Sequence, residues 1–265
     1  MAISVVTRGR TLEEVKAFVR NLPMRPSEDL QVIAVYREGG STSWSPPFTT
    51  LIPSPALRLE ARAIGIQNSS HERVLLVDSD QFPEPGLFRE LESVSCDACI
   101  IPERSANRNL VGRLTDRQRA YSEAYAMLHP GPASPAIPRF YRRDLLQYAI
   151  ERIPRPVLTV GLAHEDSILY YFTFPRVHRL GRTEGAILNS DPSFADFLRK
   201  SLQYGRYAGA LAKAPDMPIE IRELIRSVNW NILSWDPSLG LNSGIFIELV
   251  RAVPYLFGTL APGLS

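Results

Sequence analysis

Two aspartates, Asp78 and Asp80, stand one residue apart directly after the apolar run VLLV at 74–77. Each carboxylate raises the free-energy cost of ionising the other, so such a pair is typical of a site that binds a positive charge. Mg²⁺ and Mn²⁺ prefer oxygen ligands, and Mg²⁺ commonly combines one or two carboxylates with substrate phosphates. The spacing therefore predicts a divalent metal ion at Asp78 and Asp80 that holds a diphosphate, with Ser79 in the tight turn between them.

The elements that must position this pair alternate between strand and helix in the first half of the chain. We expect strands at 3–7, 30–36, 72–78 and 97–102. The first helix should follow the capping box of Thr11 and Glu14. A second helix should run from Ser54 and Pro55 to 66, and a third should follow Pro83 and Pro85. This order predicts an α/β fold with a Rossmann-like, mostly parallel central sheet flanked by helices. Ligands bind at the carboxyl ends of such strands, where Asp78 and Asp80 lie.

Two common nucleotide-binding patterns are missing from the sequence. No G-x-G-x-x-G follows the first strand, and no G-x-x-x-x-G-K-[ST] occurs anywhere. Neither a dinucleotide fingerprint nor a P-loop therefore accounts for the predicted sheet.

An arginine-rich block covers residues 104–155 and has two interpretations. Its arginines could recognise phosphate in pairs of hydrogen bonds, or they could form a solvated surface. The block lacks the interleaved aromatic residues of nucleic-acid binders apart from Tyr121 and Tyr125, so we expect no nucleic-acid partner. Its ten arginines are at 104, 108, 113, 117, 119, 139, 142, 143, 152 and 155, against four acidic residues at 116, 123, 144 and 151.

Composition and the two ends of the chain bound the class of protein. The chain has 265 residues, 45% hydrophobic and 22% charged, with a net charge of +2, as in ordinary soluble globular proteins. The N-terminus lacks a secretory signal, which predicts a cytoplasmic location. The apolar tail at 243–263 is broken by Glu248, Arg251 and Pro254. We favour a helix packed on the body of the protein over one lying in a membrane surface.

The two cysteines form a single C-x-x-C pair, Cys96 and Cys99. No second pair or nearby histidine completes a zinc site. The sequence therefore favours a reduced, half-buried pair over a redox or metal role.

In this context the sequence resembles the inverting family 2 glycosyltransferases of the GT-A fold. The resemblance lies in the order of motifs over residues 3–207: ISVVTRGR, VIAVYREGGST, EARAIGI, VLLVDSDQFPEPGLFREL and AHEDSILYY. The proline after the first strand is missing, and Ala63 replaces the asparagine of the family's ARN-x-G element. Gln203, Arg206 and Tyr207 only partly match the Q-x-x-R-W motif of processive members.

The resemblance implies a GT-A core at 1–190, with a donor half at 1–103 and an acceptor half at 104–190, and a C-terminal helical extension at 191–265. It implies metal-dependent transfer of a sugar from a nucleotide-diphosphate sugar, such as a UDP- or GDP-sugar, to an acceptor hydroxyl or lipid phosphate. The acceptor would be a saccharide or a polyprenyl phosphate, the latter with peripheral contact to the inner face of the membrane. The cofactor would be Mg²⁺ or Mn²⁺.

Site residues follow from the same resemblance. Asp166 would be the catalytic base, with Glu165 supporting the loop or contacting the acceptor, although Asp166 could instead cap the helix that follows it. The expected donor contacts are Thr7, Arg8, Glu38, Arg62, Asp78, Ser79 and Asp80. The expected substrate contacts are Arg139, Arg142, Arg143 and His164. Separate candidates for a third metal ligand or a diphosphate partner are His178, Asn189 and Asp191.

Two other functions stay open from the sequence. A sugar-phosphate nucleotidyltransferase would use a similar sheet with a glycine-rich first loop, which VVTRGRTLEE at 5–14 barely supplies. A non-catalytic sugar-nucleotide-binding protein could keep the same fold without needing Asp166.

Overall fold

A mostly parallel sheet of seven strands forms the centre of the described part of the chain. The computed structural model describes residues 2–39, 43–107, 109–160, 164–190, 193–214, 217–231, 235–240, 242 and 244–260. The strands are β1 (Ile3–Thr11), β2 (Leu30–Glu38), β3 (Thr49–Pro53), β4 (Arg73–Asp78), β6 (Ala98–Ile100), β8 (Phe140–Arg142) and β9 (Leu180–Arg182). They are ordered β3-β2-β1-β4-β8-β6-β9, and β8 alone among them runs antiparallel to its neighbours. The predicted fold class is therefore confirmed.

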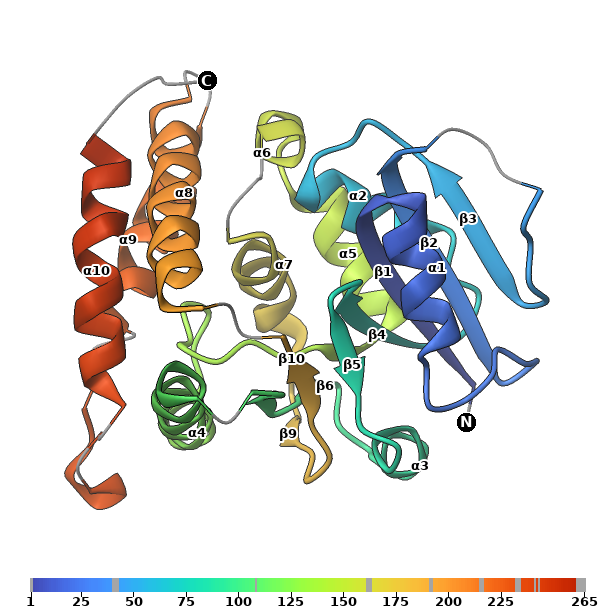
Figure 1. Cartoon of the computed structure of the whole chain (residues 1–265), viewed down its shortest axis with the longest axis horizontal. Helices are drawn as coiled ribbons and strands as arrows, with labels where there is room; N and C mark the ends of the chain where they lie inside the picture. The colour runs from blue at the N-terminus through green and yellow to red at the C-terminus, as the bar shows by residue number, and fades with distance from the viewer. Residues whose placement is uncertain are drawn as a thin grey trace.

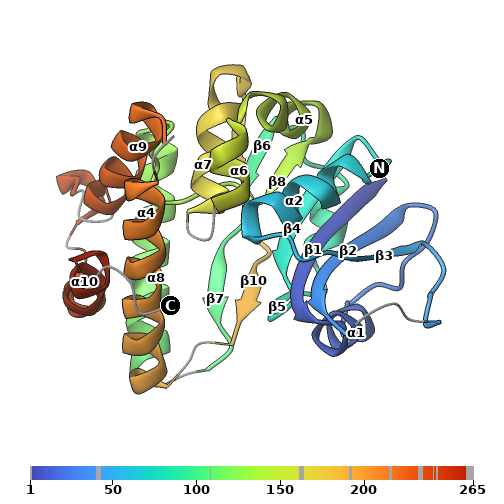
Figure 2. The same cartoon turned by 90° about the horizontal axis from the view of Figure 1, so that it is seen from above.

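Helices cover both faces of this sheet (Figure 1). They are α1 (Leu12–Arg20), α2 (Arg58–Gln67), α3 (Leu87–Leu91), α4 (Leu110–Leu128), α5 (Arg143–Arg152), α6 (Arg155–Val160), α7 (Glu165–Thr173), α8 (Phe194–Lys213), α9 (Ile219–Asn231) and α10 (Ile245–Leu260). Apolar side chains of α1 and α3 form a core with one face of the sheet, and those of α2, α5, α6 and α7 form a second core with the other face. Figure 2 shows α8, α9 and α10 on the side of the molecule away from β3.

Local sequence signals account for the first elements. The capping box predicted at Thr11 is present, with the Thr11 hydroxyl accepting from the Glu14 N–H and the Glu14 carboxylate accepting in return. The predicted start of α2 at Ser54 and Pro55 is wrong, because α2 begins at Arg58. The Ser54 N–H donates to the Tyr36 carbonyl, which keeps this segment extended beside β2.

A second, three-stranded sheet lies beyond the end of β4 and was not predicted. Its order is β5 (Gln81–Pro83), β10 (Ile187–Asn189) and β7 (Glu103–Ser105). Because β5 begins three residues after Asp78, this sheet holds the turn that contains Ser79 and Asp80. The Asp78 N–H donates to the Gln81 side chain, which fixes the same turn.

The apolar tail forms α10, which packs along α8 as the favoured interpretation predicted. A side chain at Gly205 of α8 would place its Cβ 2.0 Å from the Tyr255 carbonyl oxygen of α10. The two backbones therefore touch, with no room for a side chain between them. Within the described ranges, no helix is long and apolar enough to cross a bilayer.

The cysteine prediction is wrong. Cys96 and Cys99 form a disulfide, and both residues are buried rather than half-buried. A Cβ at Gly181 of β9 would lie 2.8 Å from the Cys99 sulfur, so the bond is packed directly under β9.

Candidate active site

The carboxyl ends of β1 and β4 bring the first functional residues together. Arg8 of β1 is paired in register with Asp78 of β4, and the Arg8 carbonyl accepts from the Ser79 N–H at 3.2 Å. The Arg8 Nε lies 3.5 Å from the Asp78 Oδ1. Two of the predicted donor contacts thus lie side by side where ligands bind in such sheets.

Arg62 lies underneath this pair, and its predicted contact with the donor is wrong. The side chain is fully buried, and it donates to the Val6 carbonyl at 3.0 Å, the Val77 carbonyl at 3.0 Å and the Asp78 Oδ1 at 2.7 Å. It reaches these partners because Gly65 lets α2 lie against β1, where a Cβ would come within 2.3 Å of Val6. Arg62 therefore joins β1 to β4 and orients Asp78 without reaching a ligand.

The pKa values of Asp78 and Asp80 are shifted in opposite directions. Burial opposes ionisation of Asp78, but the charges of Arg62 and Arg8 outweigh it and hold the pKa of Asp78 well below its ordinary value. Asp80 is exposed, yet the protein crowded around its carboxylate and the charge of Asp78 together raise its pKa. Asp78 is thus already compensated by arginine, whereas Asp80 carries the charge that a bound cation would relieve.

Glu165 and Asp166, the two acidic residues at the start of α7, lie near Asp78 at the carboxyl end of β4. The Asp166 Oδ2 accepts from Arg139, and its Oδ1 lies 4.0 Å from the Arg62 Nε and is buried without a hydrogen-bond partner. Arg62 therefore lies between Asp78 and Asp166. The alternative role of Asp166 as a helix cap is wrong, because it is the second residue of α7 and His164 is the N-cap.

Glu165 is buried, with its carboxylate 3.4 Å from Arg58 and 3.9 Å from Arg8. Burial raises its pKa, and the charges of Asp166 and Asp78 add to this, against the opposing effect of Arg58. Glu165 therefore orients two arginines and is the carboxyl of the pair that gains a proton more readily than an ordinary glutamate.

His164 precedes the acid pair in a left-handed conformation, with φ of 59°. Its Nε2 lies 3.1 Å from the Tyr255 hydroxyl of α10, so it connects α7 to the C-terminal helices. Burial, and then the charge of Arg251, lower the pKa of His164 to about 4. At neutral pH the imidazole is uncharged.

This low pKa predicts a pH effect on stability. An unfolded histidine binds its proton near pH 6.5, before folded His164 does, so stability should fall as the pH drops from about 6.5 to about 4. Replacing His164 by glutamine should flatten this part of the curve. Urea unfolding of both proteins across this range measures the difference, and parallel curves would contradict the assignment.

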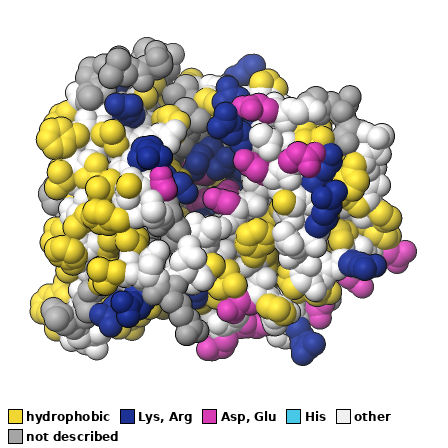
Figure 3. Space-filling model, viewed as in Figure 1, with side chains coloured by type: hydrophobic (Ala, Val, Ile, Leu, Met, Phe, Trp, Pro, Cys, Tyr) yellow, Lys and Arg dark blue, Asp and Glu magenta, His cyan; other side chains and the backbone are white. Residues whose placement is uncertain are grey.

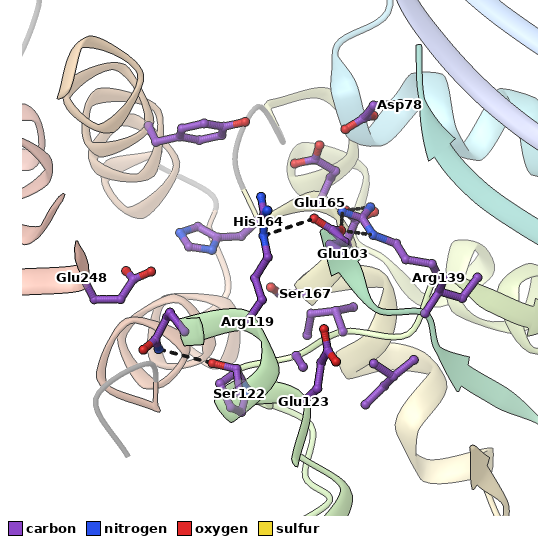
Figure 4. Close-up of a pocket in the computed structure, with 18 of the residues that line it drawn as sticks. Asp78, Glu103, Arg119, Ser122, Glu123, Arg139, His164, Glu165, Ser167 and Glu248 are labelled. Carbon is purple, nitrogen blue, oxygen red and sulfur yellow. Dashed lines mark hydrogen bonds and ion pairs between the residues drawn. The ribbon is translucent and has the colours of Figure 1, made fainter. Parts of the chain in front are cut away.

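Asp78, Arg139, His164, Glu165 and Asp166 line one cavity of about 320 Å³, whereas Arg8, Arg62 and Asp80 are not among its lining residues. Figure 4 shows Asp78, Glu165, His164 and Arg139 around it, with Glu103, Arg119 and Glu248 completing the wall. In Figure 3 charged side chains of both signs gather in a hollow between the sheet and the C-terminal helices. The structure thus places Asp78, Arg139, His164, Glu165 and Asp166 at one site.

A smaller cavity of about 170 Å³ adjoins it at the ends of β1 and β2. Arg58 lines both cavities, and Arg8 lines the smaller one. Gln203 and Tyr207 of α8 close it from the other side. Glu38 lies at the end of β2, where it is exposed and pairs with Arg10 at 3.2 Å.

Some predicted residues lie elsewhere. Thr7 is fully buried in β1, so it cannot contact a donor. Arg142 pairs in register with Arg73, the first residue of β4. Asp78 is the last residue of this strand and lies about 17 Å from Arg73 along it. Arg142 binds Asp97 and Asp144, and Arg143 binds the Ser69 carbonyl. The predicted substrate contacts at Arg142 and Arg143 are therefore wrong.

The arginine-rich block is dispersed rather than gathered into one phosphate site. Arg104 binds Glu123 at 2.8 Å, and Arg152 lies over the Tyr148 ring. From this block the cavity wall includes Arg119 and Arg139. Arg108 lies outside the described residues.

The two described candidates for a third metal ligand or a diphosphate partner, His178 and Asn189, are engaged by other residues. The His178 N–H binds Asp97, near Arg142. Asn189 bonds to Gln81 at 2.7 Å and to Glu103 at 3.0 Å, behind the turn. Asp191 lies outside the described residues.

Sequence reasoning missed Arg58, Glu103, Arg119 and Tyr204 as lining residues. Arg58 precedes Arg62 by four residues, a spacing that places both on one face of α2, so this signal was available. Glu103 follows a buried strand end and carries no comparable signal.

The side-chain oxygens of Asp78 and Asp80 fit a divalent ion that is bound together with a diphosphate. Among the described residues no group of three histidine, cysteine or acidic side chains could hold a metal by itself. Asp80, assisted by Asp78, provides the one or two carboxylates that Mg²⁺ commonly uses alongside substrate phosphates.

Comparison with known proteins supports the fold. No protein-family model matches the chain, and no curated protein does. The chain is similar to S. aureus TarS 1–349, with a TM-score of 0.53 and 12% identity over 98% of this chain and 81% of that one. For the same protein in complex with UDP-GlcNAc, the TM-score is 0.50 and the identity 12%, over 88% of this chain and 72% of that one. For the mannosyltransferase PcManGT of Pyrobaculum calidifontis, in complex with GDP-Man and Mn²⁺, the TM-score is 0.48 and the identity 14%, over 97% of this chain and 83% of that one. The shared feature is the α/β fold.

Proposed function

We propose that this chain is a metal-dependent, inverting glycosyltransferase of family 2 that uses a nucleotide-diphosphate sugar as donor. The observation that carries the proposal is the cavity at the ends of β1 and β4, which gathers Asp78, Glu165 and Asp166 with Arg58 and Arg139. Carboxylates paired with arginines in one cleft can bind sugar hydroxyls and the charge of a diphosphate. Residues 1–190 would form the catalytic core, and residues 191–265 its extension.

The donor fits across the two cavities. Its nucleoside would occupy the smaller cavity beside Tyr207, and its diphosphate would lie near Arg8 and Arg58, which border that cavity. Asp80 and Asp78 would hold Mg²⁺ or Mn²⁺. The ion would neutralise the diphosphate as it leaves. The sugar would then extend into the larger cavity.

Asp166 is the base in this proposal. The acceptor hydroxyl oxygen attacks the anomeric carbon from the face opposite the diphosphate, whose bond to that carbon breaks and which leaves with the electron pair. The hydroxyl proton passes to Asp166. Arg139 holds one carboxylate oxygen, and the other, which lies 4.0 Å from the Arg62 Nε and has no hydrogen-bond partner, would take the proton. The acceptor would be a saccharide, free or attached to a polyprenyl phosphate.

A ligand screen tests the proposal. UDP-, GDP- or dTDP-sugars with Mn²⁺ should raise the melting temperature, because a ligand at about 100 times its Kd stabilises by about 2.7 kcal/mol. The Asp80→Asn variant should lose the dependence of this shift on Mn²⁺, whereas Asp196→Asn, a change at a half-buried position in the first turn of α8, should keep it. A shift that is equal with and without Mn²⁺ in the unmodified protein contradicts metal dependence. The absence of any shift contradicts the proposed donor class.

A further inference from the structure

A third cavity, of about 560 Å³, lies between α8, α9 and α10 and differs in character from the other two. Its wall is mostly apolar and includes Ala208 and Ala212 of α8, Ile225 of α9, and Ala252 and Leu256 of α10. This size and lining are typical of a site for a hydrophobic ligand. Nothing in the proposed donor site uses this space.

The cavity shares a wall with the catalytic cavity. Glu248 and Arg251 of α10 line both, and Tyr255, which lines the apolar cavity, is 3.1 Å from His164, which lines the catalytic one. Arg251 binds Glu248 at 3.3 Å and keeps an exposed side chain. A cation therefore lies where an apolar ligand would meet the reacting groups.

The other end of the cavity opens at an exposed apolar surface. From Arg251 to Leu260 the helix rises about 14 Å. Leu256 and Leu260 line the cavity, and both are largely exposed. They belong to one stripe of α10, visible at the left of Figure 3, which is about 100° wide at the helical spacing. Its members are Phe246, Leu249, Val253, Leu256, Phe257 and Leu260, each more than half exposed.

Basic residues border this exposed end. Lys213 of α8 and Arg222 and Arg226 of α9 line the same cavity and are exposed. An apolar stripe beside several cations matches the surface of a membrane that contains anionic lipids. The positive charge of these three residues thus indicates that a ligand of the apolar cavity comes from a bilayer.

We propose that this cavity holds the hydrocarbon chain of a membrane lipid that carries the acceptor, with the phosphate of its headgroup beside Arg251 and the rest of the headgroup in the catalytic cavity. The inference rests on the proposed function, because it identifies the acceptor class of the same site. The chain leaves the bilayer at the α10 stripe and passes between α8 and α9, which brings its headgroup to Asp166.

Calorimetry with farnesyl phosphate, a soluble isoprenoid monophosphate, tests the inference. It should bind the unmodified protein at one saturable site, and farnesol or inorganic phosphate should bind about 10-fold to 100-fold more weakly. Arg251→Gln should reduce the affinity for farnesyl phosphate to that for farnesol. Ala212→Trp, which fills the cavity, should abolish binding, and Ala252→Trp provides a second filling variant if the first does not fold.

The matched control is Ala210→Trp, an exposed position on the same helix, which should bind like the unmodified protein. Each variant is also titrated with the nucleotide sugar. If the nucleotide sugar binds but farnesyl phosphate does not, or if the filling variants and the control bind it equally, the inference is overturned while the proposed function stands. If farnesyl phosphate binds in the cavity and no nucleotide sugar binds, the proposed function fails and the acceptor role fails with it.

Discussion

Replacing Asp166 by asparagine should lower the rate of transfer by about 10²-fold to 10⁴-fold and leave donor affinity unchanged. Asparagine has the same shape and can still accept a hydrogen bond from Arg139, but it cannot take a proton from the acceptor hydroxyl. Because Asp166 is the second residue of α7 and Arg139 fixes one of its oxygens, the substitution should not displace the helix. Single-turnover kinetics together with donor titration separate the two effects.

Asp144→Asn is the matched control for this prediction. Asp144 also pairs with an arginine, Arg142, but it is exposed and lies at the far end of β4. Its loss should leave transfer unchanged. If Asp166→Asn retains full activity, then another group is the base or the attacking oxygen carries no proton. If donor affinity falls together with the rate, Asp166 has a structural role.

Replacing Arg62 by methionine should destabilise the protein by about 3–5 kcal/mol at neutral pH. The change leaves the Val6 and Val77 carbonyls without their donor and removes the main charge that compensates Asp78. Methionine fills part of the same volume, so the cost reflects lost polar contacts more than an empty cavity. Urea unfolding measures this loss.

The pH dependence of this loss separates charge from packing. In the unmodified protein the pKa of Asp78 is lowered, so its ionisation contributes stability above about pH 4 that is lost as the pH falls further. The difference between Arg62→Met and the unmodified protein should therefore stay large down to about pH 5 and narrow between about pH 5 and about pH 2. Arg199→Met, at an exposed position of α8, should cost less than about 0.5 kcal/mol. An Arg62→Met deficit that is equal at both pH values would indicate packing alone.

The long elements of the fold could be predicted from sequence because their signals are local. The apolar runs of β1, β2 and β4 and the capping box of α1 each lie within about ten residues. The strand β8 could not be predicted, because its three residues are fixed by pairing with β4 and β6 rather than by their own pattern. Short strands of this kind show no readable periodicity.

The residues of the candidate active site also divide into those with a local sequence signal and those whose place depends on the tertiary fold. Asp78 and Asp166 were identified from motifs, and the structure brings them to opposite sides of Arg62. The role of Arg62 itself was misjudged, because sequence does not show whether an arginine is buried. Arg139 and Arg142 were grouped by their closeness in sequence. Arg139 directly precedes the extended strand β8, however, and Arg142 is its last residue, so about 10 Å of strand separates them.

The contact between α8 and α10 at Gly205 has a consequence for communication between ligands. The close backbone contact at Gly205 ties α8 to α10, so we expect a displacement of one helix to be passed to the other. The two helices carry Gln203 and Tyr207 beside the proposed nucleoside cavity and Leu256 and Leu260 beside the proposed lipid cavity. We therefore expect a ligand in one cavity to change the affinity of the other, and thermodynamic reciprocity would make the two effects equal in size.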